Sequence, residues 1–175
     1  MDKRLSFPAD HSFHEYPIEW MYFWGRLNTK EFFHLASFAF KVGGARGRAT
    51  HWSLHNGRAR YLEELSGDFN ELKYGIRYIA SGNWFSINCK DFSLRLYPEM
   101  LPVVHNVAKD RNYYSIPELS GEGTIYPDLD VIADVWMDHE FSSRQKFSNW
   151  DWVGIKMNCG MKIMCFSSEI DKCCS

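Results

Sequence analysis

V-W-M-D-H-E-F, at residues 135–141, combines apolar, aromatic and acidic side chains in the pattern of a half-buried β-strand. Successive side chains of a strand point to opposite faces. One face of this strand would carry Trp136, Asp138 and Glu140. The other would carry Val135, Met137, His139 and Phe141. W-D-W-V-G, at residues 150–154, repeats the aromatic and acidic pairing nine residues later. This stretch predicts an extended strand with a carboxyl group between aromatic rings.

The rest of the chain has the same character. Short runs rich in aromatic and β-branched residues are separated by Gly, Asn, Asp or Pro, which is typical of all-β proteins. Strands are predicted at 20–27, 31–42, 49–55, 58–65, 74–80, 84–88, 92–97, 121–126, 131–141, 150–157 and 161–167. Residues 61–72 give the best helical pattern, but Ser66-Gly67-Asp68 interrupts it. Asn56-Gly57 and Gly43-Gly44 are predicted hairpin turns. An antiparallel barrel or sandwich is therefore expected.

Composition excludes several classes of protein. The 175 residues are 45% hydrophobic, enough for a core and too apolar for a disordered chain. A formal net charge of −2, without a basic stripe, argues against nucleic-acid binding. No run of 18 apolar residues and no apolar leader is present, so neither a membrane span nor a signal peptide is expected. As written, the sequence predicts a cytoplasmic protein.

Two carboxyl groups are the candidates for chemistry. Glu19 precedes the aromatic run 20–24, where it either marks the wet end of a strand or faces a cavity. Asp138 lies among aromatic residues, and burial there would raise its pKa and allow it to act as an acid. The alternative for Asp138 is a strand that ends in solvent at His139-Glu140.

The remaining polar motifs predict no metal or cofactor. His51 and His55 have the spacing of a helical zinc pair but lie in a predicted strand, and no Glu follows His51. His11 and His14 precede the first strand in a polar turn, where capping or solvation explains them. Residues 43–48 lack the Lys and Ser/Thr of a phosphate loop, which favours a hairpin tip.

Four blocks of the sequence match the ordered motifs of one known family. F-P-A-D-H-S-F-H-E-Y-P-I-E-W-M-Y-F-W-G-R-L (7–27) is similar to an F-P-x-D-H…E-W-W-Y-x-x-G-x-L opening. N-Y-Y-S-I-P-E-L-S-G-E-G-T-I (112–125) resembles Y-Y-S-x-x-R-L-x-x-x-G-x-L. W-M-D-H-E-F-S-S (136–143) resembles W-M-D-R/H-E-W-S, and N-W-D-W-V-G-I-K-M (149–157) resembles G-W-D-W-F-x-L-x-L. In these motifs and their order, the chain resembles the AttH-like and carotenoid 1,2-hydratase (hydroxyneurosporene synthase) superfamily.

This resemblance implies an antiparallel lipocalin-like β-barrel with part of a second barrel. The first domain would span residues 1–109, and residues 110–175 would begin a second, incomplete one, because relatives are about twice as long. An incomplete barrel would expose strand edges and favour a homodimer or aggregation. Relatives often carry an export signal, so a periplasmic or secreted location follows if one was removed.

The resemblance also suggests site residues. Asp138 corresponds to the acid of the hydratase branch, with Trp136 two residues before it and Glu19 as a second polar group. The remaining candidates for ligand contact are Trp20, Tyr22, Trp24, Asn112, Tyr114, Glu140, Trp150 and Trp152. Asn112 replaces a His of the hydratase branch, and Met21 replaces a Trp, so the AttH-like branch fits better.

Two functions remain open at this stage. The first is a lipocalin-like protein that binds a hydrophobic small molecule, such as a polyene, isoprenoid or polyketide, in an aromatic cavity. The alternative is a cofactor-independent hydratase, isomerase or cyclase that uses Asp138 as an acid on such a molecule. In the second case an alkene would be protonated, and the aromatic faces would stabilise the carbocation before water adds.

Overall fold

The computed structural model describes residues 5–14, 16–55, 59–66, 75–105, 107, 111–143, 149–168 and 172–174. Apart from a short 3-10 turn, η1 (Ala9–His11), the regular secondary structure of these residues is β-strand. The strands are β1 (Ile18–Leu27), β2 (Phe32–Val42), β3 (Ala45–His55), β4 (Ala59–Ser66), β5 (Gly75–Ile79), β6 (Trp84–Asn88), β7 (Phe92–Pro98), β8 (Val103–Val104), β9 (Arg111–Ile125), β10 (Leu129–Ser142), β11 (Trp150–Lys156), β12 (Lys162–Ser168) and β13 (Lys172–Cys174).

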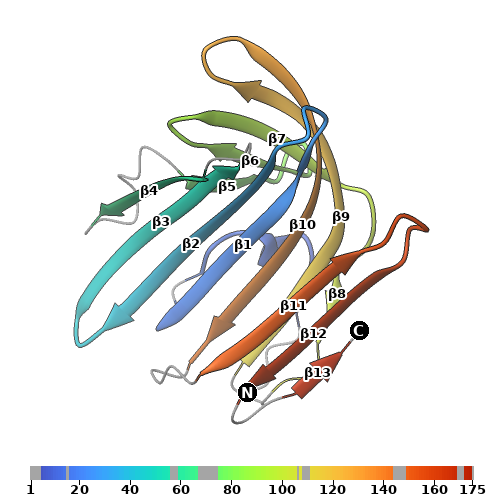
Figure 1. The fold of residues 1–175 in the computed structure, drawn as a ribbon. Coiled ribbons are helices and arrows are strands. Elements are labelled where there is room, and N and C mark those ends of the chain that lie inside the picture. Colours follow the sequence, from blue (N-terminus) through green and yellow to red (C-terminus); the bar gives the residue numbers. More distant parts are fainter. Residues whose placement is uncertain are drawn as a thin grey trace.

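One ten-stranded antiparallel sheet dominates the molecule and curls into a half-barrel (Figure 1). Its order is β4-β3-β2-β1-β10-β9-β7-β6-β5, with β8 paired to β9. A separate sheet of order β11-β12-β13 runs beside β9 and β10. The predicted all-β, antiparallel lipocalin-like class is confirmed.

The pairing of β1 with β10 sets which side chains share a face. Tyr22 is opposite Asp138, and Glu19 is opposite Phe141. The inner, concave face of the sheet carries the main apolar core, which includes Met21, Phe23 and Met137. The alternation predicted for residues 135–141 therefore holds, and Trp136 and Asp138 lie on the outer face.

The segment before β1 covers the inner face. Phe7 packs edge-on against Tyr114, with ring centroids 4.8 Å apart. Phe13 lies under the guanidinium of Arg48, whose Cζ is 3.9 Å from the ring centroid. Arg48 also donates from Nη2 to the carbonyl oxygen of Ile76 at 3.1 Å, which links β3 to β5 across the open side of the half-barrel.

The three-stranded sheet covers part of the outer face. Trp152 of β11 and Phe166 of β12 pack with Tyr113 and Trp136 of the large sheet. We call the side chains of Trp20, Trp24, Tyr113, Trp136, Trp152 and Phe166 the aromatic layer. It is a second, smaller core between the two sheets.

Several local predictions can be compared with the structure. Gly43 and Gly44 form the β2–β3 turn with φ of 57° and 84°, as predicted. β9 begins at Arg111, well before the predicted start at residue 121. Asn56-Gly57 lies outside the described residues, as does the end of the 61–72 helical pattern, whose start belongs to β4.

The proposed division near residue 109 stays a prediction, although strands from both sides of it share the ten-stranded sheet. The predicted homodimer also stays a prediction. Within the described ranges, the structure contains no helix with the length and apolarity to span a membrane.

Candidate functional site

Asp138 is the buried acid of the outer face. Its side chain is 0% exposed. Oδ1 accepts hydrogen bonds from the Ser115 hydroxyl and, at 3.1 Å, from the Tyr113 hydroxyl. Oδ2 makes no hydrogen bond of normal geometry among the described residues, although the Trp136 side chain lies near enough to lower the pKa of this carboxyl group. Burial raises the pKa of Asp138 to about 7, against the opposing effect of Ser115, Trp136 and Tyr113. Asp138 can therefore hold a proton near neutral pH.

A polar chain leads from Asp138 to a cavity. His105 Nε2 lies 2.8 Å from Ser115 Oγ, and because Ser115 donates its proton to Asp138, His105 must donate to Ser115. A cavity of about 350 Å³ is lined by His105, Ser115, Trp136 and Lys162, among others. The acid is thus one hydroxyl away from a space that could hold a small molecule or water.

Trp152 joins the aromatic layer to the acid. Its indole Nε1 donates to the Tyr113 hydroxyl at 3.0 Å, and Tyr113 donates on to Asp138. The ring meets Tyr22, Trp24 and Trp136 edge-on, with centroids 5.9, 6.0 and 6.4 Å away. A second cavity of about 350 Å³ borders Trp152 on the side of Tyr22 and Trp24. Space lined by aromatic rings, with His34, Ser53 and His55 as polar groups, therefore flanks the layer.

The His105 ring gives a prediction for stability against pH. Burial lowers its pKa to about 4 from the usual 6.5. In the unfolded chain the His105 ring takes up a proton near pH 6.5, whereas in the folded chain it does so only near pH 4. The free energy of unfolding therefore falls as the pH drops from 6.5 towards 4. Between pH 7 and pH 5 the ring should contribute a loss of about 2 kcal/mol. Urea unfolding of His105→Gln at both values should show that much less loss than the original chain; equal losses would contradict this assignment.

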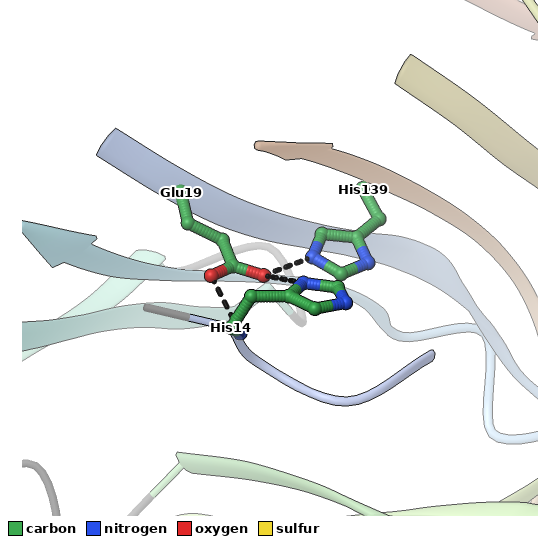
Figure 2. A group of neighbouring side chains, drawn as sticks. All are labelled: His14, Glu19 and His139. Atoms are coloured by element: carbon green, nitrogen blue, oxygen red, sulfur yellow. Dashed lines mark hydrogen bonds and ion pairs between the residues drawn. The ribbon is translucent and has the colours of Figure 1, made fainter. Parts of the chain in front are cut away.

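The inner face carries a different polar cluster (Figure 2). His14 Nδ1 and His139 Nε2 each lie 2.8 Å from Glu19 Oε1. The backbone N–H of His14 donates to Glu19 Oε2 at 2.7 Å. Burial lowers the pKa of His139, whereas the carboxylates of Glu19 and Asp10 outweigh burial and raise that of His14. We call His14, Glu19 and His139 the inner triad.

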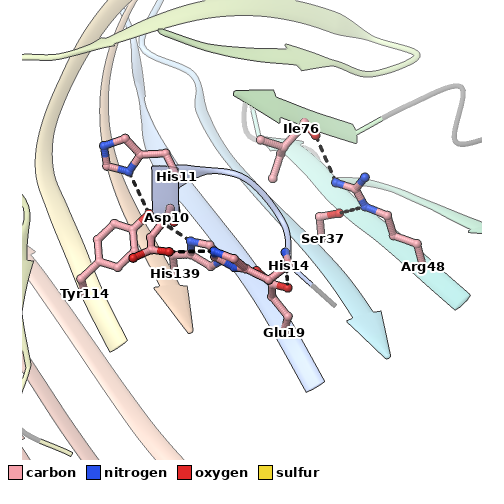
Figure 3. A network of polar contacts seen from close by, with 9 residues as sticks. All are labelled: Asp10, His11, His14, Glu19, Ser37, Arg48, Ile76, Tyr114 and His139. Carbon is pink, nitrogen blue, oxygen red and sulfur yellow. Dashed lines mark hydrogen bonds and ion pairs between the residues drawn. The ribbon is translucent and has the colours of Figure 1, made fainter. Parts of the chain in front are cut away.

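A wider network surrounds the inner triad (Figure 3). Asp10 Oδ1 lies 3.0 Å from His14 Nε2. The Tyr114 hydroxyl lies 3.0 Å from His139 Nδ1 and 2.9 Å from His11 Nδ1, and it donates to the backbone oxygen of Asp10 at 2.9 Å. His14 and His139, which contact Glu19 through one ring nitrogen, therefore each have the other ring nitrogen beside an oxygen atom.

The structure separates the two predicted carboxyl groups, because Glu19 and Asp138 lie on opposite faces of the sheet. Tyr114 is inner, with Glu19, and Asn112 is paired in register with the inner residue Phe141. The other predicted residues lie on the outer face or on β11. Trp20 stacks on the half-exposed Trp150, with centroids 6.0 Å apart. Glu140 forms an ion pair with Arg111, with Nε and Oε1 3.0 Å apart.

Several residues of these sites were missed by the sequence-based reasoning. His11 and His14 are not solvated turn residues: His11 is 4% exposed, because the segment before β1 is packed onto the inner face. Tyr113 and Ser115 lie in the block at residues 112–125, but that block did not single them out, and His105 lies in no motif. Strand pairing brings Tyr113 and Ser115 to Asp138, and His105 contacts Ser115. The His51 ring lies tilted against that of His34, with centroids 5.2 Å apart. Among the described residues, the inner triad is the group that could hold a metal ion.

Comparison with known proteins shows which solved structures share this fold. No protein-family model matches the chain, and no curated protein matches it. Among solved structures, it is similar to a candidate AttH protein from Nitrosomonas europaea, with TM-score 0.75 and 22% identity over 97% of this chain and 67% of that one. It is also similar to kievitone hydratase from Nectria haematococca, with TM-score 0.61 and 9% identity over 99% of this chain and 71% of the other.

These similarities confirm, at the level of the fold, the resemblance to AttH-like proteins that the four sequence blocks indicated. Both neighbours share the all-β lipocalin-like architecture with this chain. At identities of 22% and 9%, they say nothing further about its ligand or its chemistry.

Proposed function

We propose that this chain, which has the lipocalin-like fold of an AttH-type protein and a hydratase, binds an apolar unsaturated small molecule beside the aromatic layer and protonates it with Asp138. The reaction class is hydration of a carbon–carbon double bond, without a cofactor. The hydratase activity named for the second structural neighbour belongs to that protein, and it serves here as a precedent for the fold.

The position of Asp138 carries this proposal. A fully buried carboxyl group with one oxygen unpartnered among the described residues is costly unless it holds a proton or serves a function. Asp138 lies among aromatic rings, and its other oxygen is fixed by Ser115 and Tyr113. Such fixation is what a positioned acid requires.

The chemistry balances with the groups present. With Ser115 or Trp136 turned aside to admit the alkene, Asp138 gives its proton to one alkene carbon, and the neighbouring carbon becomes a carbocation. The faces of Trp136 and Trp152 carry negative electrostatic potential and stabilise that charge. A water molecule adds to the cation and releases a proton, which returns to the Asp138 carboxylate. The sum is alkene plus water giving an alcohol, and the acid is regenerated.

A second candidate is a binding protein without chemistry. Asp138 is 0% exposed, and Ser115 and Trp136 line the nearest cavity in its place. A ligand held there would touch these side chains without reaching the acid. In that case the carboxyl group orients Ser115 and Tyr113 and has a structural role.

Incubation of the chain with a panel of polyenes and isoprenoid alkenes in ¹⁸O-labelled water separates the two candidates. A hydratase should give alcohol products that contain the label, detected by mass spectrometry. Quenching of tryptophan fluorescence by the same compounds measures binding. Saturable quenching with no labelled product from any compound would overturn the catalytic proposal and support the binding protein.

A further inference from the structure

The inner triad is independent of the proposed acid, because it lies on the other face of β10. It joins the segment before β1, the start of β1 and the end of β10, with partners 120 residues apart in sequence. Glu19 and His139 are both 0% exposed. Its hydrogen-bond donors can be assigned one by one from the neighbouring atoms.

Tyr114 fixes the tautomer of His139. A tyrosine hydroxyl has one hydrogen, and that of Tyr114 goes to the carbonyl oxygen of Asp10, which can only accept. Towards His139 Nδ1, the hydroxyl is therefore an acceptor, and Nδ1 carries the hydrogen. In a neutral ring, Nε2 then carries no hydrogen, and its lone pair points at Glu19 Oε1, 2.8 Å away.

Asp10 fixes His14 in the same way. The carboxylate of Asp10 accepts from the backbone N–H of Ser6 through Oδ2 and faces His14 Nε2 through Oδ1. Nε2 of His14 therefore donates, and in a neutral ring Nδ1 is a second lone pair directed at Glu19 Oε1 from 2.8 Å. Two imidazole nitrogens and one carboxylate oxygen thus face one another as acceptors. A cation between them resolves this conflict.

We propose that the inner triad binds one divalent transition-metal ion of the zinc type, through His14 Nδ1, Glu19 Oε1 and His139 Nε2. The three ligand atoms lie within 4.8 Å of one another. Small side-chain shifts would therefore place each of them at roughly 2.0–2.2 Å from a metal ion between them, the usual length of such metal–ligand bonds. Two imidazoles with one carboxylate suit zinc, cobalt or ferrous ions better than calcium or magnesium, which prefer oxygen ligands.

The surrounding network has the arrangement expected of outer partners at a metal site. Metal-bound histidines usually donate their other ring N–H to a carboxylate or another oxygen, which fixes the ring orientation. Asp10 does this for His14, and Tyr114 does it for His139. The backbone N–H of His14 holds the second oxygen of Glu19. The competing occupant is an additional proton on a histidine ring.

Metal titration of the whole chain, after removal of metals with a chelator, distinguishes the two occupants. One Zn²⁺ per chain should bind and raise the thermal midpoint. Co²⁺ should give the visible absorption of nitrogen and oxygen ligands, without the intense near-ultraviolet band that cysteine ligands produce. His14→Gln and Glu19→Gln should each weaken Zn²⁺ binding at least 10-fold, whereas His51→Gln, on β3, should bind like the original chain.

Some outcomes would overturn the proposal. If the folded original chain shows no saturable Zn²⁺ or Co²⁺ binding, the cluster is a proton-bridged network. The same conclusion follows if the His14→Gln chain binds with unchanged affinity. His14 lies in the segment before β1 and is partly exposed, so its variant should fold even if the Glu19 variant does not. Binding that disappears with His51→Gln instead would place the metal on β3.

Discussion

Replacing Asp138 by Asn should lower turnover of a hydrated alkene at least 100-fold, because the amide has no proton to give to carbon. Asn has the same shape, and its amide oxygen can still accept from Ser115 and Tyr113. The aromatic layer should therefore keep its geometry, and the dissociation constant measured by tryptophan quenching should change less than about 3-fold, well under 1 kcal/mol. The reduced rate would then come from the chemical step.

The matched control is Asp134→Asn. Asp134 is on the same face of the same strand, but its side chain is 62% exposed and paired with Lys156. Exposed ion pairs contribute little, so both turnover and binding should stay close to those of the original chain. Equal turnover in the Asp138→Asn and original chains would remove Asp138 from the mechanism and leave the carboxyl group with a structural role.

Gly121→Ala should destabilise the fold by more than about 3 kcal/mol, or prevent soluble folding altogether. A Cβ atom at this position would lie 1.8 Å from the backbone oxygen of Arg95. The clash is between the backbones of β9 and β7, which pair at Gly121 and Leu96, so no side chain can move aside to relieve it. The strands would have to separate where the sheet turns from β9 towards β6 and β5.

Gly47→Ala is the control for this change. Its added Cβ would meet the ring of Phe40 at 2.5 Å, but that ring is 40% exposed and can rotate outwards. We expect a loss of about 1 kcal/mol or less in urea unfolding. If Gly121→Ala unfolds at the same urea concentration as Gly47→Ala, the backbones of β9 and β7 do not approach each other as closely as described.

Sequence reasoning succeeded where the pattern is local. Alternation within residues 135–141 predicted that Asp138 and Trp136 share a face, and it holds because a strand reverses its side chains at every residue. The Gly43-Gly44 turn was found for a similar reason, since positive φ angles favour glycine. The start of β9 was missed because Pro117, seen in the sequence alone, indicates the end of a strand. In the structure, a register shift opposite residues 135–137 accommodates this proline within β9.

Pairing between distant strands could not be read in this way. Whether Glu19 and Asp138 meet depends on the register of β1 against β10, which sets Tyr22 opposite Asp138. The burial of His14 depends on the path of the segment before β1, which a polar turn pattern does not reveal. Ser115 reaches Asp138 because β9 pairs with β10, and His105, which follows β8, reaches Ser115 because β8 pairs with β9.

A crystal structure of the chain with a bound polyene, such as cis-parinaric acid, tests the central claim most directly. The account predicts the polyene between the large sheet and β11, against Trp136 or Trp152, with the cavity of Ser115 and His105 at one end. Density for the polyene on the inner face, among Phe23, Phe85 and the rest of the main core, would contradict the account and remove Asp138 from the site.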